Sequence, residues 1–136
     1  FFVSGSEDST LKLWNLQSGE CVRTFIGHAS HIWTVTKLDS KRIISGSSDG
    51  SVISWNVTNG KPTHTCRGHD TSVTVLAAAT PNLFLSGSAD KSIRLWNVSQ
   101  KACIRTYKGH SGCVASVSIV PPQKLVISGS SDATIK

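Results

Sequence analysis

The sequence predicts an all-β protein made of small antiparallel sheets that repeat along the chain. Two observations predict this class: three short motifs recur with one period, and each period holds four strand-like segments separated by turn signals. Ser-Gly-Ser begins at Ser4, Ser45, Ser86 and Ser128, at intervals of 41, 41 and 42 residues. Gly-His and Trp-Asn each recur three times at intervals of 41 residues. Three markers with one shared period indicate a structural repeat.

The period that covers residues 29–69 shows the expected elements most clearly. Segments 31–38, 43–49, 51–57 and 62–69 are rich in residues that favour strands, and polar turns lie between them. No apolar spacing of 3.6 residues runs long enough to predict a helix. The glycine inside each Ser-Gly-Ser motif lies in mid-strand, where glycine marks the close approach of another part of the chain.

A four-stranded unit of about 40 residues cannot bury both faces of its sheet alone, so neighbouring copies must stack. Such sheets arranged around a central axis form a β-propeller, which closes with about four to eight blades. The 136 residues hold a little over three periods. We therefore expect a partial β-propeller of four-stranded antiparallel blades.

The expected blade boundaries follow from the motif positions. Residues 29–69 and 70–110 form blades, and 111–136 form a partial blade that stops inside the third strand. Residues 1–28 supply the second, third and fourth strands of another partial blade. The simplest interpretation is an excerpt from a longer chain or a part of a larger complex.

The cores of three repeats resemble the WD-repeat (WD40) β-propeller family. They read SGSEDSTLKLWN (4–15), SGSSDGSVISWN (45–56) and SGSADKSIRLWN (86–97), with Asn where the family pattern ends in Asp. The resemblance extends over essentially the whole chain. It implies a non-catalytic scaffold or adaptor that presents a propeller face to protein or peptide partners.

The resemblance also implies a hydrogen-bonded polar set in each blade, formed by the His of Gly-His, the first Ser of Ser-Gly-Ser, the turn Asp and the Trp. Mapped onto this chain, the two complete sets are His28, Ser45, Asp49, Trp55 and His69, Ser86, Asp90, Trp96, and the two partial sets are His110, Ser128, Asp132 and Ser4, Asp8, Trp14. Ser, His and Asp together could suggest a hydrolase triad. A triad is needed only once, however, whereas this trio recurs in every blade, so we expect a structural role.

Partner contacts in the family often come from three positions per blade around the channel mouth. The mapped positions are His31, Trp33 and Ser48; Ser72, Thr74 and Ala89; Cys113, Ala115 and Ser131; and Glu7 from the opening partial blade. Trp33 breaks the repeat, because its equivalents are Thr74 and Ala115. A tryptophan at such a position is typical of an interface anchor.

The composition favours protein partners over other classes. The formal net charge is +6, but Lys and Arg are scattered, with one adjacent pair at Lys41-Arg42, which predicts a solvated basic rim and no nucleic-acid partner. The four cysteines match no zinc-ligand spacing, which indicates a reducing cytoplasm or nucleus and no metal. No phosphate-binding loop appears, so we expect neither a cofactor nor enzymatic activity. No apolar run approaches the roughly 20 residues of a membrane span.

Two alternatives remain open at this stage. The chain could be the substrate-receptor propeller of a ubiquitin ligase, although receptors of this type that read phosphopeptides place Arg at mouth positions, where this chain has none. It could also be a structural subunit of an RNA-processing complex, for which the basic balance gives some support. Catalysis by an attached enzyme would require residues outside these 136.

Overall fold

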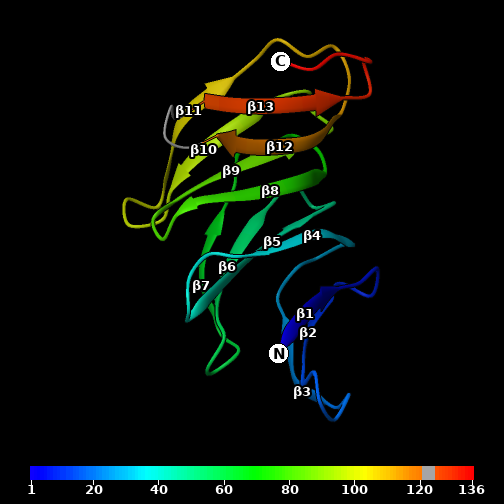
Figure 1. Cartoon of the computed structure of the whole chain (residues 1–136), viewed down its shortest axis with the longest axis vertical. Helices are drawn as coiled ribbons and strands as arrows, with labels where there is room; N and C mark the ends of the chain where they lie inside the picture. Colours follow the sequence, from blue (N-terminus) through cyan, green and yellow to red (C-terminus); the bar gives the residue numbers. More distant parts are fainter. Residues whose placement is uncertain (121–124) are drawn as a thin grey trace.

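The computed structural model describes residues 1–120 and 125–136, and this part of the chain forms antiparallel sheets without a helix (Figure 1). The first sheet contains β1 (Phe2–Gly5), β2 (Thr10–Trp14) and β3 (Cys21–Ile26). The second contains β4 (Ile32–Lys37), β5 (Arg42–Ser47), β6 (Val52–Asn56) and β7 (Pro62–Cys66). The third contains β8 (Val73–Thr80), β9 (Leu83–Ser88), β10 (Ile93–Asn97) and β11 (Ala102–Tyr107). The fourth contains β12 (Val114–Val120) and β13 (Leu125–Ser130).

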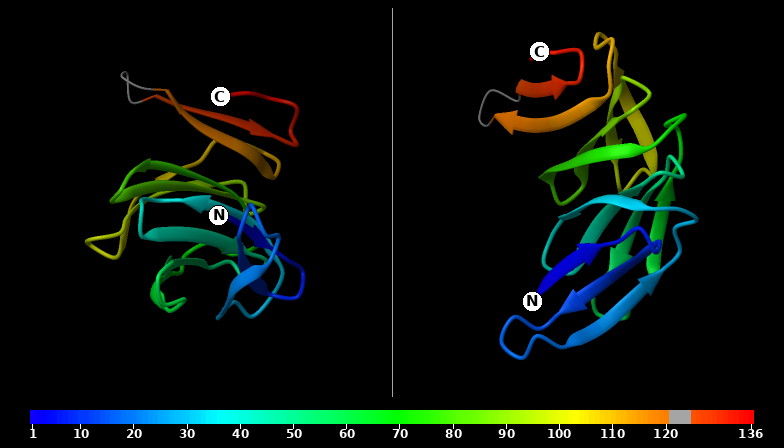
Figure 2. Two further views of the ribbon diagram at one scale, coloured as in Figure 1. Left: turned by 60° about the horizontal axis from the view of Figure 1, so that its bottom comes forward. Right: turned by 90° about the vertical axis from the view of Figure 1, so that its right-hand side faces the viewer.

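The sheets follow one another in chain order, so that the first and fourth lie at opposite ends of the molecule (Figures 1 and 2). Within each sheet, every strand pairs with its neighbour in sequence. Between sheets, the closest contacts join β4 to β8 and β8 to β12, while β1 packs against β4. This arrangement confirms the prediction of an all-β partial propeller built from four-stranded antiparallel sheets.

Two kinds of side-chain-capped turn set the lengths of the strands. In each Trp-Asn motif, the Asn caps the next turn. The side-chain oxygen of Asn56, for example, accepts a hydrogen bond from the backbone N–H of Thr58 at 2.8 Å. Between the second and third strands, an Asp carboxylate caps the turn in the same way, as Asp49 does for the N–H of Ser51 at 2.8 Å. The strand expected to extend to Asp49 therefore ends at Ser47.

Three apolar clusters lie between successive sheets and hold the stack together. Leu11, Phe25 and Trp55 belong to the cluster between the first and second sheets. Ile44, Phe84 and Trp96 belong to the cluster between the second and third sheets. A smaller cluster between the third and fourth sheets includes Leu85, Ile93 and Val114. Each sheet thus buries its faces mainly against its neighbours, as stacking of repeats requires.

The mid-strand glycines lie where successive sheets come closest. A Cβ atom added to Gly46 would lie 2.6 Å from Cγ1 of Val73, and one added to Gly87 would lie 2.6 Å from Cγ1 of Val114. Gly5 stands in the same relation to Ile32, also at 2.6 Å. In each case the neighbour is the first residue of the following sheet. The glycines therefore permit the spacing between sheets, in agreement with the expected close approach.

Candidate functional site

The third sheet contains a buried chain of polar groups that runs from Asp90 through His69 and Ser86 to Trp96. The Nδ1 atom of His69 lies 2.7 Å from Oδ2 of Asp90, and its Nε2 atom lies 2.7 Å from Oγ of Ser86. The same Oγ accepts from the indole N–H of Trp96 at 2.7 Å. The His69 side chain is fully buried and the Asp90 side chain is 8% exposed. The structure thus brings together all four residues of this mapped set.

The second sheet repeats the arrangement around His28. Its Nδ1 lies 3.2 Å from Oδ2 of Asp49, and its Nε2 lies 2.8 Å from Oγ of Ser45. The indole N–H of Trp55 donates to the same Oγ at 2.8 Å. In both sheets the backbone N–H that follows the histidine also donates to the aspartate, from Ala29 at 2.9 Å here. This bond fixes the loop that leads into the next strand.

The two partial sets keep the bonds that their residues allow. His110 lies 2.9 Å from Asp132 and 2.8 Å from Ser128 in the fourth sheet. The hydroxyl of Thr134 donates to Asp132 and is the main cause that holds the pKa of this carboxyl well below its usual range. In the first sheet, the indole N–H of Trp14 donates to Ser4 at 2.9 Å. Asp8 lies in the following turn, where it accepts from the backbone N–H and the hydroxyl of Thr10, and within the described part of the chain it makes no hydrogen bond to Ser4 or Trp14.

A neutral histidine satisfies every group in the complete sets. With its proton on Nδ1, His69 donates to Asp90, and its unprotonated Nε2 accepts from the hydroxyl of Ser86. The Ser86 oxygen is then free to accept from Trp96. A second proton on Nε2 would leave the serine hydroxyl without its acceptor in a buried place, where an unpaired polar group is costly.

The electrostatics of the site agree with this assignment. Burial lowers the pKa of His28 and His69 below the ordinary value of 6.5, and this effect exceeds the opposing influence of the aspartates. Burial would raise the pKa of each aspartate, but hydrogen bonds from the neighbouring hydroxyl, backbone N–H and histidine outweigh it. The pKa of Asp49 and of Asp90 is consequently about 2. At neutral pH, each complete set therefore holds one negative charge on the aspartate beside a neutral imidazole.

Each of these sets contains one further residue, which the sequence analysis did not predict. The hydroxyl of Ser51 donates to Oδ1 of Asp49 at 2.6 Å, and the hydroxyl of Ser92 donates to Oδ1 of Asp90 at 2.6 Å. Thr134 makes the equivalent bond to Asp132. The signal was present in the sequence, because each turn reads Asp-x-Ser or Asp-x-Thr. This hydroxyl occupies the aspartate oxygen that the histidine leaves free.

The buried polar sets do not have the geometry of a nucleophilic centre. Ser45 and Ser86 have no exposed surface, and the oxygen of each is already shared between the histidine and the indole N–H. A catalytic serine must reach a substrate carbonyl, which these two cannot do. The arrangement instead links the loop before a sheet to its second and third strands.

The mapped partner positions form the rim at the same end of the strands. In each of three sheets, two of them are joined by one backbone hydrogen bond: Ser48 N–H to His31 at 2.8 Å, Ala89 N–H to Ser72 at 3.0 Å and Ser131 N–H to Cys113 at 2.9 Å. The remaining position in each sheet lies at a β-bulge near the start of the first strand, which places Trp33, Thr74 and Ala115 there. Bulges redirect a side chain without ending the strand.

The three bulge residues have different surroundings. Trp33 is 57% exposed, and its indole N–H donates to the hydroxyl of Ser48 at 2.6 Å. Thr74 is half-buried, and its hydroxyl contacts the backbone carbonyl of Val114 in the next sheet. Ala115 is exposed. The Trp33 ring is therefore held in a fixed orientation with much of its surface open to solvent, whereas Thr74 takes part in packing between sheets.

Glu7 belongs to the same rim through its position in the chain. The backbone N–H of Ile32 donates to the carbonyl of Ser6 at 3.0 Å, so the loop that carries Glu7 is bonded to the start of the strand that carries Trp33. Both residues are exposed.

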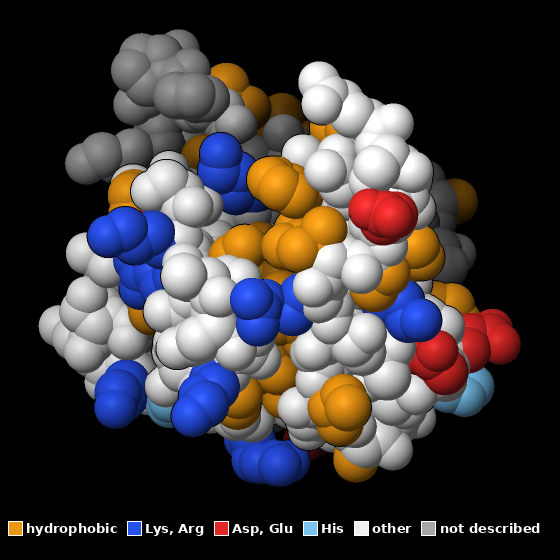
Figure 3. Space-filling view, turned by 90° about the horizontal axis from the view of Figure 1, so that it is seen from below, with side chains coloured by type: hydrophobic (Ala, Val, Ile, Leu, Met, Phe, Trp, Pro, Cys, Tyr) orange, Lys and Arg blue, Asp and Glu red, His pale blue; other side chains and the backbone are white. Residues whose placement is uncertain are grey.

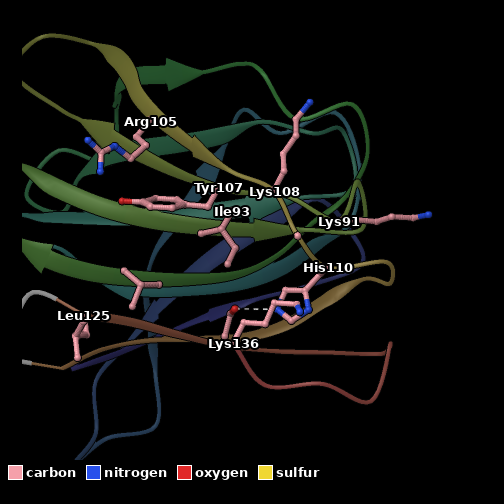
Figure 4. A pocket seen from close by; sticks show the side chains of 11 residues that line it. Lys91, Ile93, Arg105, Tyr107, Lys108, His110, Leu125 and Lys136 are labelled. Carbon is pink, nitrogen blue, oxygen red and sulfur yellow. Dashed lines mark hydrogen bonds between the residues drawn. The ribbon is translucent and has the colours of Figure 1, made fainter.

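Two of the cavities in the described part of the chain lie beside the incomplete first and fourth sheets. One, of about 320 Å³, lies between the third and fourth sheets and is lined by Tyr107, Gly109, His110 and Ser128 among others (Figure 4). In the preceding sheets, the indole rings of Trp55 and Trp96 pack against the equivalent glycines, Gly27 and Gly68. The other cavity, of about 440 Å³, lies between β1 and β4. Both are places where the other sheets carry a further strand, so we assign no ligand to them.

The described residues hold neither a cluster of potential metal ligands nor a helix that could span a membrane. Among them, no group of His, Cys, Asp and Glu side chains is arranged to hold a metal ion. The same part of the chain offers no helix with the length and apolar character of a membrane span.

Comparison with known proteins identifies the repeat. The sequence profile described as "WD domain, G-beta repeat" matches residues 1–15, 19–56, 60–97 and 101–136. The crystal structure of the computationally designed Ika8 protein is similar with a TM-score of 0.87 and 30% identity, over 98% of this chain and 41% of that chain. The WD40 β-propeller domain of Doa1 is similar with a TM-score of 0.87 and 28% identity, over 98% of this chain and 44% of that chain.

Curated relatives match over shorter segments. F-box/WD repeat-containing protein 7 of Drosophila melanogaster is 50% identical over 32 residues, which are 24% of this chain and 2% of the relative. A probable E3 ubiquitin ligase complex SCF subunit, sconB, of Neosartorya fischeri is 41% identical over 44 residues, which are 32% of this chain and 6% of the relative. The matched segments thus span a small fraction of these relatives, about the length of one repeat.

Proposed function

The chain belongs to the WD40 repeat family, and from this premise we propose that it is a non-catalytic scaffold that binds protein or peptide partners at the rim around Trp33. The observation that carries the proposal is the exposed, hydrogen-bonded ring of Trp33 on a rim of mapped contact positions. Tryptophan is enriched among residues that dominate binding energy. A ring already held in place loses little conformational freedom on binding.

The other mapped rim residues would supply contacts around this anchor. His31, Ser48 and Glu7 surround Trp33 in the first two sheets, whereas Ser72, Ala89, Cys113, Ala115 and Ser131 continue the rim over the third and fourth. The proposed repeat units are 1–28, 29–69, 70–110 and 111–136, and the sheet composition supports this division. We place the protein in the cytoplasm or nucleus, which is supported by the four free cysteines among the described residues.

A second candidate function is substrate recognition within a ubiquitin ligase. It is favoured by the short matches to an F-box/WD repeat protein and to SCF subunits. The two complete polar sets would have a structural role in either case, since Ser45 and Ser86 are buried. Both functions use the rim for docking, so the same experiment tests whether the rim binds proteins.

The test is quantitative affinity capture with the immobilised chain and a cell lysate. The variants are Trp33→Ala at the rim and Leu16→Ala, an exposed apolar residue in the turn after β2, as the matched control. We expect Trp33→Ala to lose most of at least one captured protein at unchanged circular dichroism, whereas Leu16→Ala should retain it. Equal capture by both variants and the wild type would refute docking at Trp33.

A further inference from the structure

The charged residues of the chain are distributed unevenly around Trp33. Three loops surround this residue at the rim: 6–9, 27–31 and 48–51. They contain Glu7, Asp8 and Asp49, but no Lys or Arg, although the whole chain has fourteen basic and eight acidic residues. Seen from below, the visible acidic side chains lie on one side of the face, and most Lys and Arg side chains lie on the other (Figure 3). The protein is basic overall but acidic beside its exposed tryptophan.

The carboxylates of these loops differ in the number of hydrogen bonds that they already accept within the protein. Asp49 accepts hydrogen bonds from Ser51 and Ala29 and lies beside His28, so it contributes charge but has little capacity for a partner. Asp8 similarly accepts from Thr10 in its own turn. Glu7 is exposed, and no hydrogen bond to its side chain occurs within the described part of the chain. Glu7 is thus the acid available to an incoming group.

The indole of Trp33 offers the other half of a recognition site. Its N–H is committed to Ser48, whose own backbone N–H is bound to His31, so the ring cannot rotate freely. What remains for a partner is the ring face, which attracts cations through its quadrupole. An aromatic face beside a free carboxylate is complementary to a guanidinium group, which can stack on the ring and donate hydrogen bonds to the carboxylate at the same time.

We infer that the rim around Trp33 receives a basic segment of a partner protein, with an Arg side chain stacked on the Trp33 indole and paired with the Glu7 carboxylate. This inference rests on the proposed docking function and names its partner class. Phosphate-bearing partners are disfavoured there, because they would approach three carboxylates without a neighbouring cation. An apolar segment would leave Glu7 and His31 facing apolar groups.

The test measures fluorescence anisotropy of three labelled 12-residue peptides that differ only in four positions. These positions hold Arg, Gln or Glu in an otherwise Gly-Ser sequence. We expect the whole chain to bind the Arg peptide at least tenfold more tightly than the Gln and Glu peptides, and binding should weaken between about 50 and 300 mM salt, because exposed ion pairs are screened.

Variants assign the binding to the inferred residues. Trp33→Ala should weaken Arg-peptide binding about fivefold to twentyfold, as expected for loss of a cation–π contact, and Trp33→Phe should retain most of it. Glu7→Gln should weaken it about twofold to fivefold at low salt. Glu20→Gln, an exposed acid in the turn before β3, and Leu16→Ala should stay within twofold of the wild type.

The outcomes separate this inference from the docking function. Equal binding of the Arg and Gln peptides, or unchanged Arg-peptide binding by folded Trp33→Ala, overturns the inference. If the Glu peptide binds through Trp33 instead, the rim docks acidic partners, so the inference fails while the docking function stands. If Trp33→Ala changes neither peptide binding nor lysate capture, both fail.

Discussion

Replacement of Asp90 by alanine tests the role of the polar sets most directly. The change removes the acceptor of two buried donors, the Nδ1–H of His69 and the hydroxyl of Ser92. Two backbone N–H groups, of Asp70 and Ser92, also lose their acceptor. Each buried donor left unpaired costs about 1–3 kcal/mol, whereas water can replace the bond to the exposed turn at Asp70. We therefore expect a loss of at least about 2 kcal/mol in the free energy of unfolding.

Urea unfolding followed by circular dichroism measures this loss, with two comparison variants. Asp70→Ala removes a neighbouring exposed carboxylate and should change the free energy of unfolding by less than about 0.5 kcal/mol, as is usual at the surface. Asp90→Asn keeps one acceptor oxygen but brings an amide N–H₂ toward a donor. Its loss in the free energy of unfolding should therefore lie between those of Asp90→Ala and Asp70→Ala. If Asp90→Ala and Asp70→Ala unfold at the same urea concentration, the polar set does not stabilise the fold.

Two further predictions concern pH and the contact between sheets. The pKa of His28 and His69 is lower in the fold than the ordinary 6.5. Their contribution to the free energy of unfolding is therefore present above about pH 6.5 and is lost as the pH falls below it. The carboxyls of Asp49 and Asp90, whose pKa is about 2, add a second loss of stability between about pH 4 and 2. Urea midpoints that stay constant from pH 7.5 to 5 would contradict the histidine assignment. Separately, Gly87→Ala should cost about 1–3 kcal/mol, because its Cβ would lie 2.6 Å from buried Val114, whereas Gly129→Ala meets only the exposed hydroxyl of Ser116 and should cost less. Equal unfolding free energies for the two variants would argue against close packing at Gly87.

The sequence predicted the fold because its main determinants repeat. The glycine of Ser-Gly-Ser and the capping Asp occur in all four sheets, and the Asn after Trp occurs in three; each meets a local steric or hydrogen-bonding requirement of the repeat. A signal that occurs three or four times at one spacing is readable without coordinates. Strand ends were less readable: the second strand of the second sheet ends at Ser47, because the turn caps begin there.

The site was predicted in part, and each missing part depends on three-dimensional geometry that residue spacing does not encode. Ser51 and Ser92 were overlooked because a serine after a turn has many possible partners, and only the geometry selects the free oxygen of the aspartate. The bulge at Trp33 was not predicted either, because the extra residue shifts the alternation of faces within a strand of only six residues, which is too short to show the shift. The bond between Thr74 and the next sheet depends on packing across sheets, which residue spacing does not encode.

Under the proposed function, the residues that stabilise the sheets and the residue that would bind a partner occupy different positions of the repeat. Residues that stabilise one sheet recur in the next, since His28 and His69 occupy equivalent positions and make the same hydrogen bonds. The bulge lies outside the strand pairing and outside the polar set, so its side chain can change without loss of either. Trp33, Thr74 and Ala115 at equivalent bulges show that freedom within one chain. An exposed residue that differs from its own equivalents in the chain is consequently a better guide to binding than the polar groups that recur.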